Sequence, residues 1–152
     1  MAIKVEPLAQ SLGAEIRGVD LSQPLDDATF GAIHQAHLDY SVIVFRGQRL
    51  EPEQQIAFSG RFGDFEIHVM SQFLRPGHPE ILVISNDKNE AGDAVGIEDA
   101  GRYWHSDLSY LPEPSLGSLL YAIEVPPEGG DTKFASMYAA YDALSDSRRE
   151  EL

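Results

Sequence analysis

The sequence contains no cysteine, little positive charge and no long apolar run. Without cysteine the chain cannot form a disulfide framework or a cysteine-based zinc module. Lysine and arginine number 11 against 25 aspartates and glutamates, which gives a formal net charge of -14. We therefore expect no nucleic-acid partner and no membrane partner, because phosphate backbones and anionic lipids both attract basic surfaces.

No apolar run reaches the roughly 20 residues that span a bilayer, and residues 1–6 lack the apolar stretch of a signal peptide. These features predict a cytoplasmic protein. The length of 152 residues fits a single domain, 1–152, with a hydrophobic core of its own.

Hydrophobic periodicity and turn residues predict a mixture of helices and strands. Helices are expected over residues 28–40 after an N-cap at 25–27, from Pro52 to near Gly63, and over 137–144. Strands are expected at residues 3–5, 14–20, 41–45, 81–84, 102–109, 116–125 and 132–136. On the first helix, one face is expected to carry Phe30, Ile33, His37 and Leu38.

Residues 86–101 combine five acidic side chains and three glycines with one lysine. Such a segment buries little apolar surface, so we expect a mobile acidic surface loop. Long loops in compact domains often act as lids or binding loops, which makes residues 86–101 a candidate lid.

The run Tyr103-Trp104-His105-Ser106-Asp107 has the most informative pattern. On a strand, residues i and i+2 point to the same face. His105 and Asp107 could then offer a nitrogen and a carboxylate oxygen to one metal ion, as in the 2-His-1-carboxylate triad of non-haem Fe(II) oxygenases. The plain alternative is a partly buried polar strand, since His-x-Asp often occurs by chance.

Further motifs follow one another along the chain, and they lie in residues 13–21, 44–48, 58–63, 104–107, 126–135 and 139–144. In these motifs the chain resembles the N-terminal portion of the taurine and phenoxyacetate dioxygenase family of Fe(II)- and 2-oxoglutarate-dependent oxygenases. The resemblance implies an α+β, mainly β fold: a distorted double-stranded β-helix (jelly-roll, cupin-like) with flanking helices. We expect the barrel to be incomplete in this chain, because family members are longer, and exposed strand edges then favour homo-oligomers or poor solubility.

The resemblance also implies roles for individual residues. His105 and Asp107 match two iron ligands, and Thr132 matches a threonine that helps to hold a carboxylate of 2-oxoglutarate. His68 matches a histidine that contacts the primary substrate, and Trp104 is expected to pack in the core beside the metal. Without the resemblance, Thr132 would be a strand residue after a Gly-Gly turn and His68 an ordinary loop histidine.

The implied reaction hydroxylates a C–H bond of a small organic sulfonate or carboxylate, with Fe(II), 2-oxoglutarate and O2, and releases succinate and CO2. The family's second iron-binding histidine and its 2-oxoglutarate-binding arginines lie beyond residue 152. His34 and His37 are expected at a helix surface and not at the metal. We therefore expect the 152-residue chain to be inactive alone.

Three alternatives stay open. The chain could be a non-catalytic jelly-roll fragment or binding module, a cupin-like enzyme that uses zinc or manganese, or an acidic globular protein without a site. Asp107 argues against halogenation, since that chemistry vacates the carboxylate position. Residues 69–71 and Gly101 stand where the taurine enzyme has polar groups, which disfavours taurine as the substrate.

Overall fold

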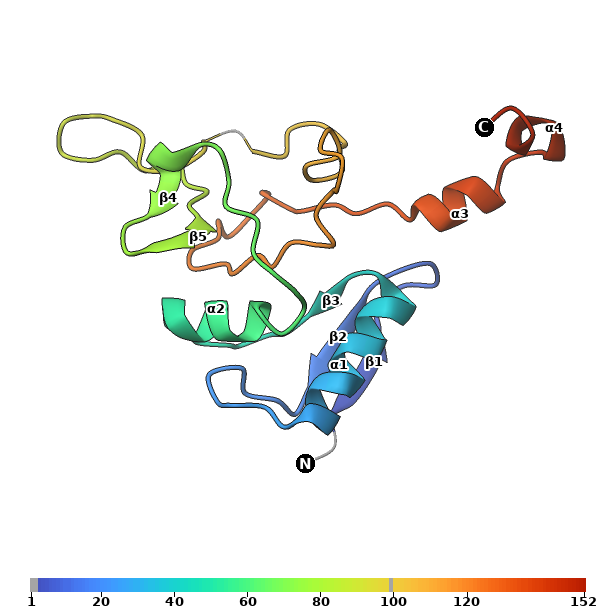
Figure 1. Cartoon of the computed structure of the whole chain (residues 1–152), viewed down its shortest axis with the longest axis horizontal. Coiled ribbons are helices and arrows are strands. Elements are labelled where there is room, and N and C mark those ends of the chain that lie inside the picture. The colour runs from blue at the N-terminus through green and yellow to red at the C-terminus, as the bar shows by residue number, and fades with distance from the viewer. Residues whose placement is uncertain (1–2, 99) are drawn as a thin grey trace. The chain divides into compact units, whose positions relative to one another are not determined.

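The computed structural model describes residues 3–98 and 100–152, and the chain forms two compact units (Figure 1). The first unit comprises Met1–Arg49 and Lys133–Leu152, and the second comprises Leu50–Thr132. None of the helices in the described ranges is long and apolar enough to cross a membrane.

The first unit contains a three-stranded sheet in the order β1-β2-β3. Strand β1 (Lys4–Pro7) pairs antiparallel with β2 (Ala14–Arg17), and β2 pairs parallel with β3 (Ile43–Val44). A parallel pair needs a crossover, and helix α1 (Asp27–Tyr40) provides it. The predicted strands at 3–5, 14–20 and 41–45 are therefore present, although they are shorter or shifted.

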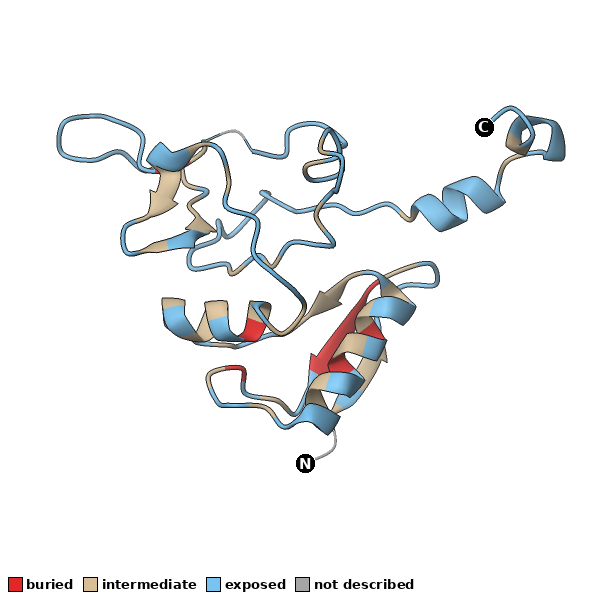
Figure 2. Ribbon diagram, in the orientation of Figure 1, coloured by how far each residue is buried: buried red, intermediate tan, exposed pale blue. Residues whose placement is uncertain are grey.

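Helix α1 and strand β2 form the core of this unit, as the buried residues in Figure 2 show. Ile33 and Ala36 of α1 are three residues apart and so lie on one face, and both are buried, as are Ala14 and Ile16 of β2. Leu38 is 61% exposed, so its predicted place on one face with the buried Ile33 is wrong. It follows Ala36 by two positions, which turns it about 200° away from that residue on a helix.

The start of α1 agrees with the sequence. The carboxylate of Asp26 accepts a hydrogen bond from the backbone N–H of Thr29 at 2.6 Å, which is the expected N-cap contact. His34 stacks on Phe30 with ring centroids 6.1 Å apart. The pKa of His37 is lowered, first by partial burial and then by the neighbouring His34.

The second unit begins with helix α2 (Pro52–Ser59), which packs against β5 (His78–Leu82). Strand β5 pairs antiparallel with β4 (Leu74–Arg75), which follows a short 3-10 helix, η1 (Ser71–Phe73). The predicted strand at 81–84 is thus found at a slightly earlier position.

The predicted acidic loop is exposed but has more order than expected. A β-bridge joins Lys88 to Ala94, and the side chain of Asn89 accepts two hydrogen bonds from the backbone N–H groups of Ala91 and Asp93. Gly96 is buried, and a Cβ there would lie 2.7 Å from the backbone nitrogen of Ser85. Residues 88–94 form a closed hairpin-like turn around these contacts. Asp99, which belongs to the predicted loop, lies outside the described residues.

The strands predicted at 102–109, 116–125 and 132–136 are wrong for this chain, because these residues carry no strand assignment. A strand exists only when a neighbour completes its backbone hydrogen bonds, and the described ranges provide no ladder for these segments. The chain ends in two short helices with serine N-caps, α3 (Met137–Asp142) and α4 (Asp146–Arg149), so the third predicted helix is confirmed in shorter form.

The burial of α1 generates a stability prediction. Ile33→Ala should lower the free energy of unfolding by about 2–5 kcal/mol, because it leaves a cavity in the core. Leu38→Ala should change it by less than about 0.5 kcal/mol, because this side chain is largely in solvent. Urea denaturation followed by circular dichroism measures both, and equal losses would contradict the placement of the buried face.

Candidate metal centre

His105 and Asp107 lie in a segment without regular secondary structure, immediately before a reversal of the chain. Leu108 has φ of 50°, in the left-handed region that side chains rarely adopt. Its carbonyl oxygen accepts a hydrogen bond from the backbone N–H of Leu111 at 3.0 Å, which closes the turn. The two side chains lie close together, as expected, although the strand on which that expectation rested is absent.

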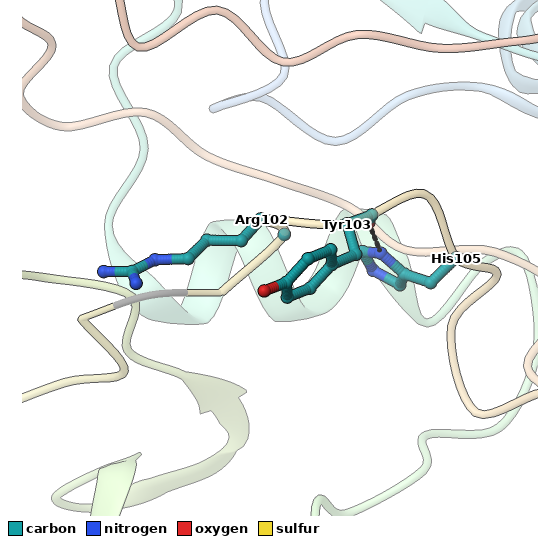
Figure 3. Close-up of a pocket in the computed structure, with 4 residues that line it drawn as sticks. Arg102, Tyr103 and His105 are labelled. Atoms are coloured by element: carbon teal, nitrogen blue, oxygen red, sulfur yellow. Dashed lines mark hydrogen bonds between the residues drawn. The ribbon is translucent and has the colours of Figure 1, made fainter.

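The ring of His105 is oriented by a backbone contact. Its Nδ1 lies 2.7 Å from the carbonyl oxygen of Tyr103, and Figure 3 shows the imidazole folded back over that residue. A carbonyl oxygen can only accept a hydrogen bond, so Nδ1 carries a proton. In the neutral ring Nε2 therefore has a free electron pair, which a metal ligand requires.

That nitrogen faces the carboxylate of Asp107. Nε2 of His105 and Oδ1 of Asp107 are 3.1 Å apart. Two atoms that carry electron pairs repel one another at this distance unless a cation lies between or beside them. The pKa of His105 is raised, chiefly by the hydrogen bond to Tyr103; desolvation opposes this shift, and the charge of Asp107 and a hydrogen bond to it add to it. The pair thus attracts either a proton or a metal ion.

The second oxygen of Asp107 is also fixed. The hydroxyl of Ser118 donates a hydrogen bond to Oδ2 at 2.5 Å, from eleven residues further along the chain. Neither this contact nor that of His105 with the Tyr103 carbonyl is among the sequence-based predictions. No pattern in the sequence points to either: the Tyr103 contact depends on the local backbone between residues 103 and 105, and the Ser118 contact depends on the reversal at Leu108.

The pair is accessible from solvent. The side chains of His105 and Asp107 are 53% and 52% exposed. A surface hollow of about 310 Å³ is lined by Gly101, Arg102, Tyr103 and His105 (Figure 3). An imidazole nitrogen and a carboxylate oxygen are a donor set that suits Fe(II), but the described residues contain no group of three or more such donors.

The structure does not bring the other predicted site residues to this pair. His68 is half-buried, and its Nδ1 accepts a hydrogen bond from the backbone N–H of Met70 at 3.2 Å. Thr132 is exposed. Within residues 3–98 and 100–152 no hydrogen bond or ion pair joins either residue to His105 or Asp107. Trp104 is 71% exposed, so its predicted packing in the core is wrong.

The turn before Thr132 requires its glycines. Gly129 and Gly130 have φ of 75° and 70°, and a Cβ on Gly130 would lie 2.9 Å from Cγ of Pro126. Glycine is the residue that adopts such angles without steric cost. The Gly-Gly-Asp-Thr motif is therefore shaped by a close approach of the backbone to Pro126.

Comparison with known proteins identifies the family. The profile of the taurine catabolism dioxygenase TauD, TfdA family matches residues 4–152. The chain belongs to this family. The resemblance found in the sequence motifs is thus confirmed over nearly the whole chain.

The TauD, TfdA chain spans about half the length of the relatives that it matches. It is 37% identical to the (S)-phenoxypropionate/alpha-ketoglutarate-dioxygenase of Delftia acidovorans, over 97% of this chain and 51% of the relative. The crystal structure of a taurine dioxygenase from Burkholderia xenovorans matches with a TM-score of 0.84 and 34% identity, over 99% of this chain and 51% of that one. The crystal structure of AAD-2 in complex with Mn(II) and N-oxalylglycine matches with a TM-score of 0.72 and 33% identity, over 99% of this chain and 49% of that one.

The geometry of this TauD, TfdA chain predicts how His105 titrates. We expect its pKa to lie above the ordinary 6.5, so the pair is stabilised below that pH and loses this stabilisation as the pH rises through the folded-state pKa. Asp107→Asn should lower the pKa of His105 without removing the Tyr103 contact. NMR titration of the imidazole in the metal-free chain measures this, and an unchanged pKa in Asp107→Asn would contradict the contact.

Proposed function

We propose that this chain forms part of an Fe(II)- and 2-oxoglutarate-dependent dioxygenase that hydroxylates a C–H bond of a small organic carboxylate or sulfonate. The observation that carries the proposal is the facing pair of His105 Nε2 and Asp107 Oδ1, 3.1 Å apart. Its nitrogen-and-oxygen donor set suits iron. Zinc sites are also built from such donors, but the family match and the names of the relatives favour iron and 2-oxoglutarate.

A solved relative supports the choice of cosubstrate. The crystal structure of AAD-2 is a complex with Mn(II) and N-oxalylglycine. N-oxalylglycine carries the same oxo group beside a carboxylate that 2-oxoglutarate uses to chelate a metal. When bound, iron and 2-oxoglutarate would supply the oxidation, in which 2-oxoglutarate and O2 give succinate, CO2 and one oxygen atom for the substrate.

The chain's own residues hold and orient the reacting groups in this proposal. Tyr103 keeps the proton on Nδ1 of His105, which leaves Nε2 for the metal. Asp107 supplies a negatively charged oxygen that offsets part of the metal's charge. Thr132 offers a hydroxyl that can donate to a carboxylate of 2-oxoglutarate.

His68 is the proposed contact to the primary substrate. Because its Nδ1 accepts a hydrogen bond from Met70, the neutral ring carries its proton on Nε2. That N–H can donate to the oxygen of an anionic substrate. The relatives act, by name, on phenoxypropionate and taurine, a carboxylate and a sulfonate.

Finer predictions about the fold, the location and the activity belong to the same proposal. The protein's barrel is a double-stranded β-helix, and the segment 86–101 is a lid that keeps water away from the bound cosubstrate. The protein acts in the cytoplasm and uses no nucleic-acid or membrane partner. The 152-residue chain does not turn over alone, because the described part provides two metal donors and not three.

Anaerobic titration with Fe(II) and 2-oxoglutarate tests the function without knowledge of the substrate. A polypeptide that carries residues 1–152 and continues to the length of the relatives should show the weak visible charge-transfer band of the chelate. The band should be lost in His105→Ala and in Asp107→Ala. It should persist in His78→Ala, a histidine of the same unit whose Nε2 lies 3.5 Å from Glu53.

That titration tests the oxygenase proposal and the inactivity of the 152-residue chain separately. No band in the longer polypeptide would refute the oxygenase proposal. A band in the 152-residue chain alone, dependent on His105 and Asp107, would show that the site assembles here and that the chain is not inactive for want of a ligand.

The proposed contacts of Thr132 and His68 can be separated by which ligand each variant weakens. Thr132→Val should raise, by about tenfold or more, the 2-oxoglutarate concentration at which the charge-transfer band reaches half of its full intensity. The reason is that a hydrogen bond to a charged group contributes about 1.5–3 kcal/mol. Thr132→Ser should keep most of the affinity. His68→Ala should instead raise the KM for phenoxypropionate with 2-oxoglutarate binding unchanged, and loss of 2-oxoglutarate binding in His68→Ala would contradict its role.

A further inference from the structure

The carboxylate of Asp107 has two oxygens, and the structure gives them different partners. Oδ1 faces Nε2 of His105 at 3.1 Å, and Oδ2 accepts the hydroxyl proton of Ser118 at 2.5 Å. A carboxylate oxygen only accepts hydrogen bonds, so Ser118 is the donor. A donor–acceptor distance this short is typical of a strong hydrogen bond to an ionised group.

The turn after Asp107 explains why a serine so far along the chain reaches it. Leu108 adopts φ of 50°, and the hydrogen bond from Leu111 to its carbonyl closes the reversal. The following segment then runs back toward the pair, and Ser118 lies eleven residues after Asp107. The contact is not a solvent-excluded core bond, because Ser118 and Asp107 are both exposed. Its loss should therefore change the stability of the unit little.

We propose that Ser118 is a positioning residue for the metal-binding carboxylate. The inference rests on the proposed function, in that it takes His105 and Asp107 as the metal ligands. With Oδ2 engaged by Ser118, Oδ1 is the oxygen that Asp107 would offer to a metal. Binding through one oxygen would leave more of the metal's coordination positions for 2-oxoglutarate and O2.

The hydrogen bond acts before any metal binds. It fixes the rotation of the carboxylate, so less side-chain freedom is lost when the metal arrives. Outer partners of metal ligands commonly change metal affinity by about 10–100-fold. We therefore expect Ser118→Ala to weaken Mn(II) binding by about 10–100-fold in the longer polypeptide used for the iron titration, with the urea midpoint of unfolding unchanged.

The test titrates that longer polypeptide with Mn(II) alone and measures free Mn(II) by electron paramagnetic resonance. Ser118→Thr keeps the hydroxyl and should restore most of the affinity lost in Ser118→Ala. Ser109→Ala is the matched control, because Ser109 is also exposed and lies two residues after Asp107, and it should bind like the wild type.

The outcomes distinguish the inference from the function on which it rests. If His105→Ala binds Mn(II) as tightly as the wild type, the proposed metal site itself is wrong. If wild-type binding requires His105 but Ser118→Ala binds equally well, the positioning role of Ser118 is overturned. A loss in Ser118→Ala that Ser118→Thr fails to restore would also overturn it, because the effect would then not follow the hydroxyl.

Discussion

An electron pair on Nε2 of His105 points at a negatively charged oxygen of Asp107 across 3.1 Å. This arrangement is unfavourable unless a positive charge joins it, and the remaining contacts of the site maintain it. Tyr103 fixes which nitrogen is protonated, and Ser118 fixes which oxygen is presented. A proton or a metal ion satisfies the pair, so its occupancy by metal depends on competition between the two cations.

The first unit is predictable from sequence because its signals are local. The N-cap within residues 25–27, the helix that follows it and the apolar strand at 43–44 each depend on a few neighbouring residues. The prediction for Leu38 is wrong because it follows from the apolar character of the side chain and not from its angle around the helix, two positions beyond Ala36.

The second half of the chain is less predictable because its structure depends on distant partners. Residues 102–136 have the composition of strands, but strand pairing is non-local, and the described part offers them no neighbour. The expectation that His105 and Asp107 meet comes from their i, i+2 spacing on a strand; they do lie close together, but in an irregular segment. No spacing predicts the Ser118 contact, because it requires a reversal at Leu108, and leucine is not a residue that normally indicates a left-handed turn.

The reversal at Leu108 also decides how well the site keeps its shape. A left-handed backbone costs a residue such as leucine roughly 1–2 kcal/mol, a cost that glycine would not have. The side chain of Leu108 is half-buried, and the burial of apolar surface offsets part of that cost. The Ser118 contact with Asp107 depends on this turn, so a substitution that changes the backbone at Leu108 would alter coordination chemistry without touching a ligand.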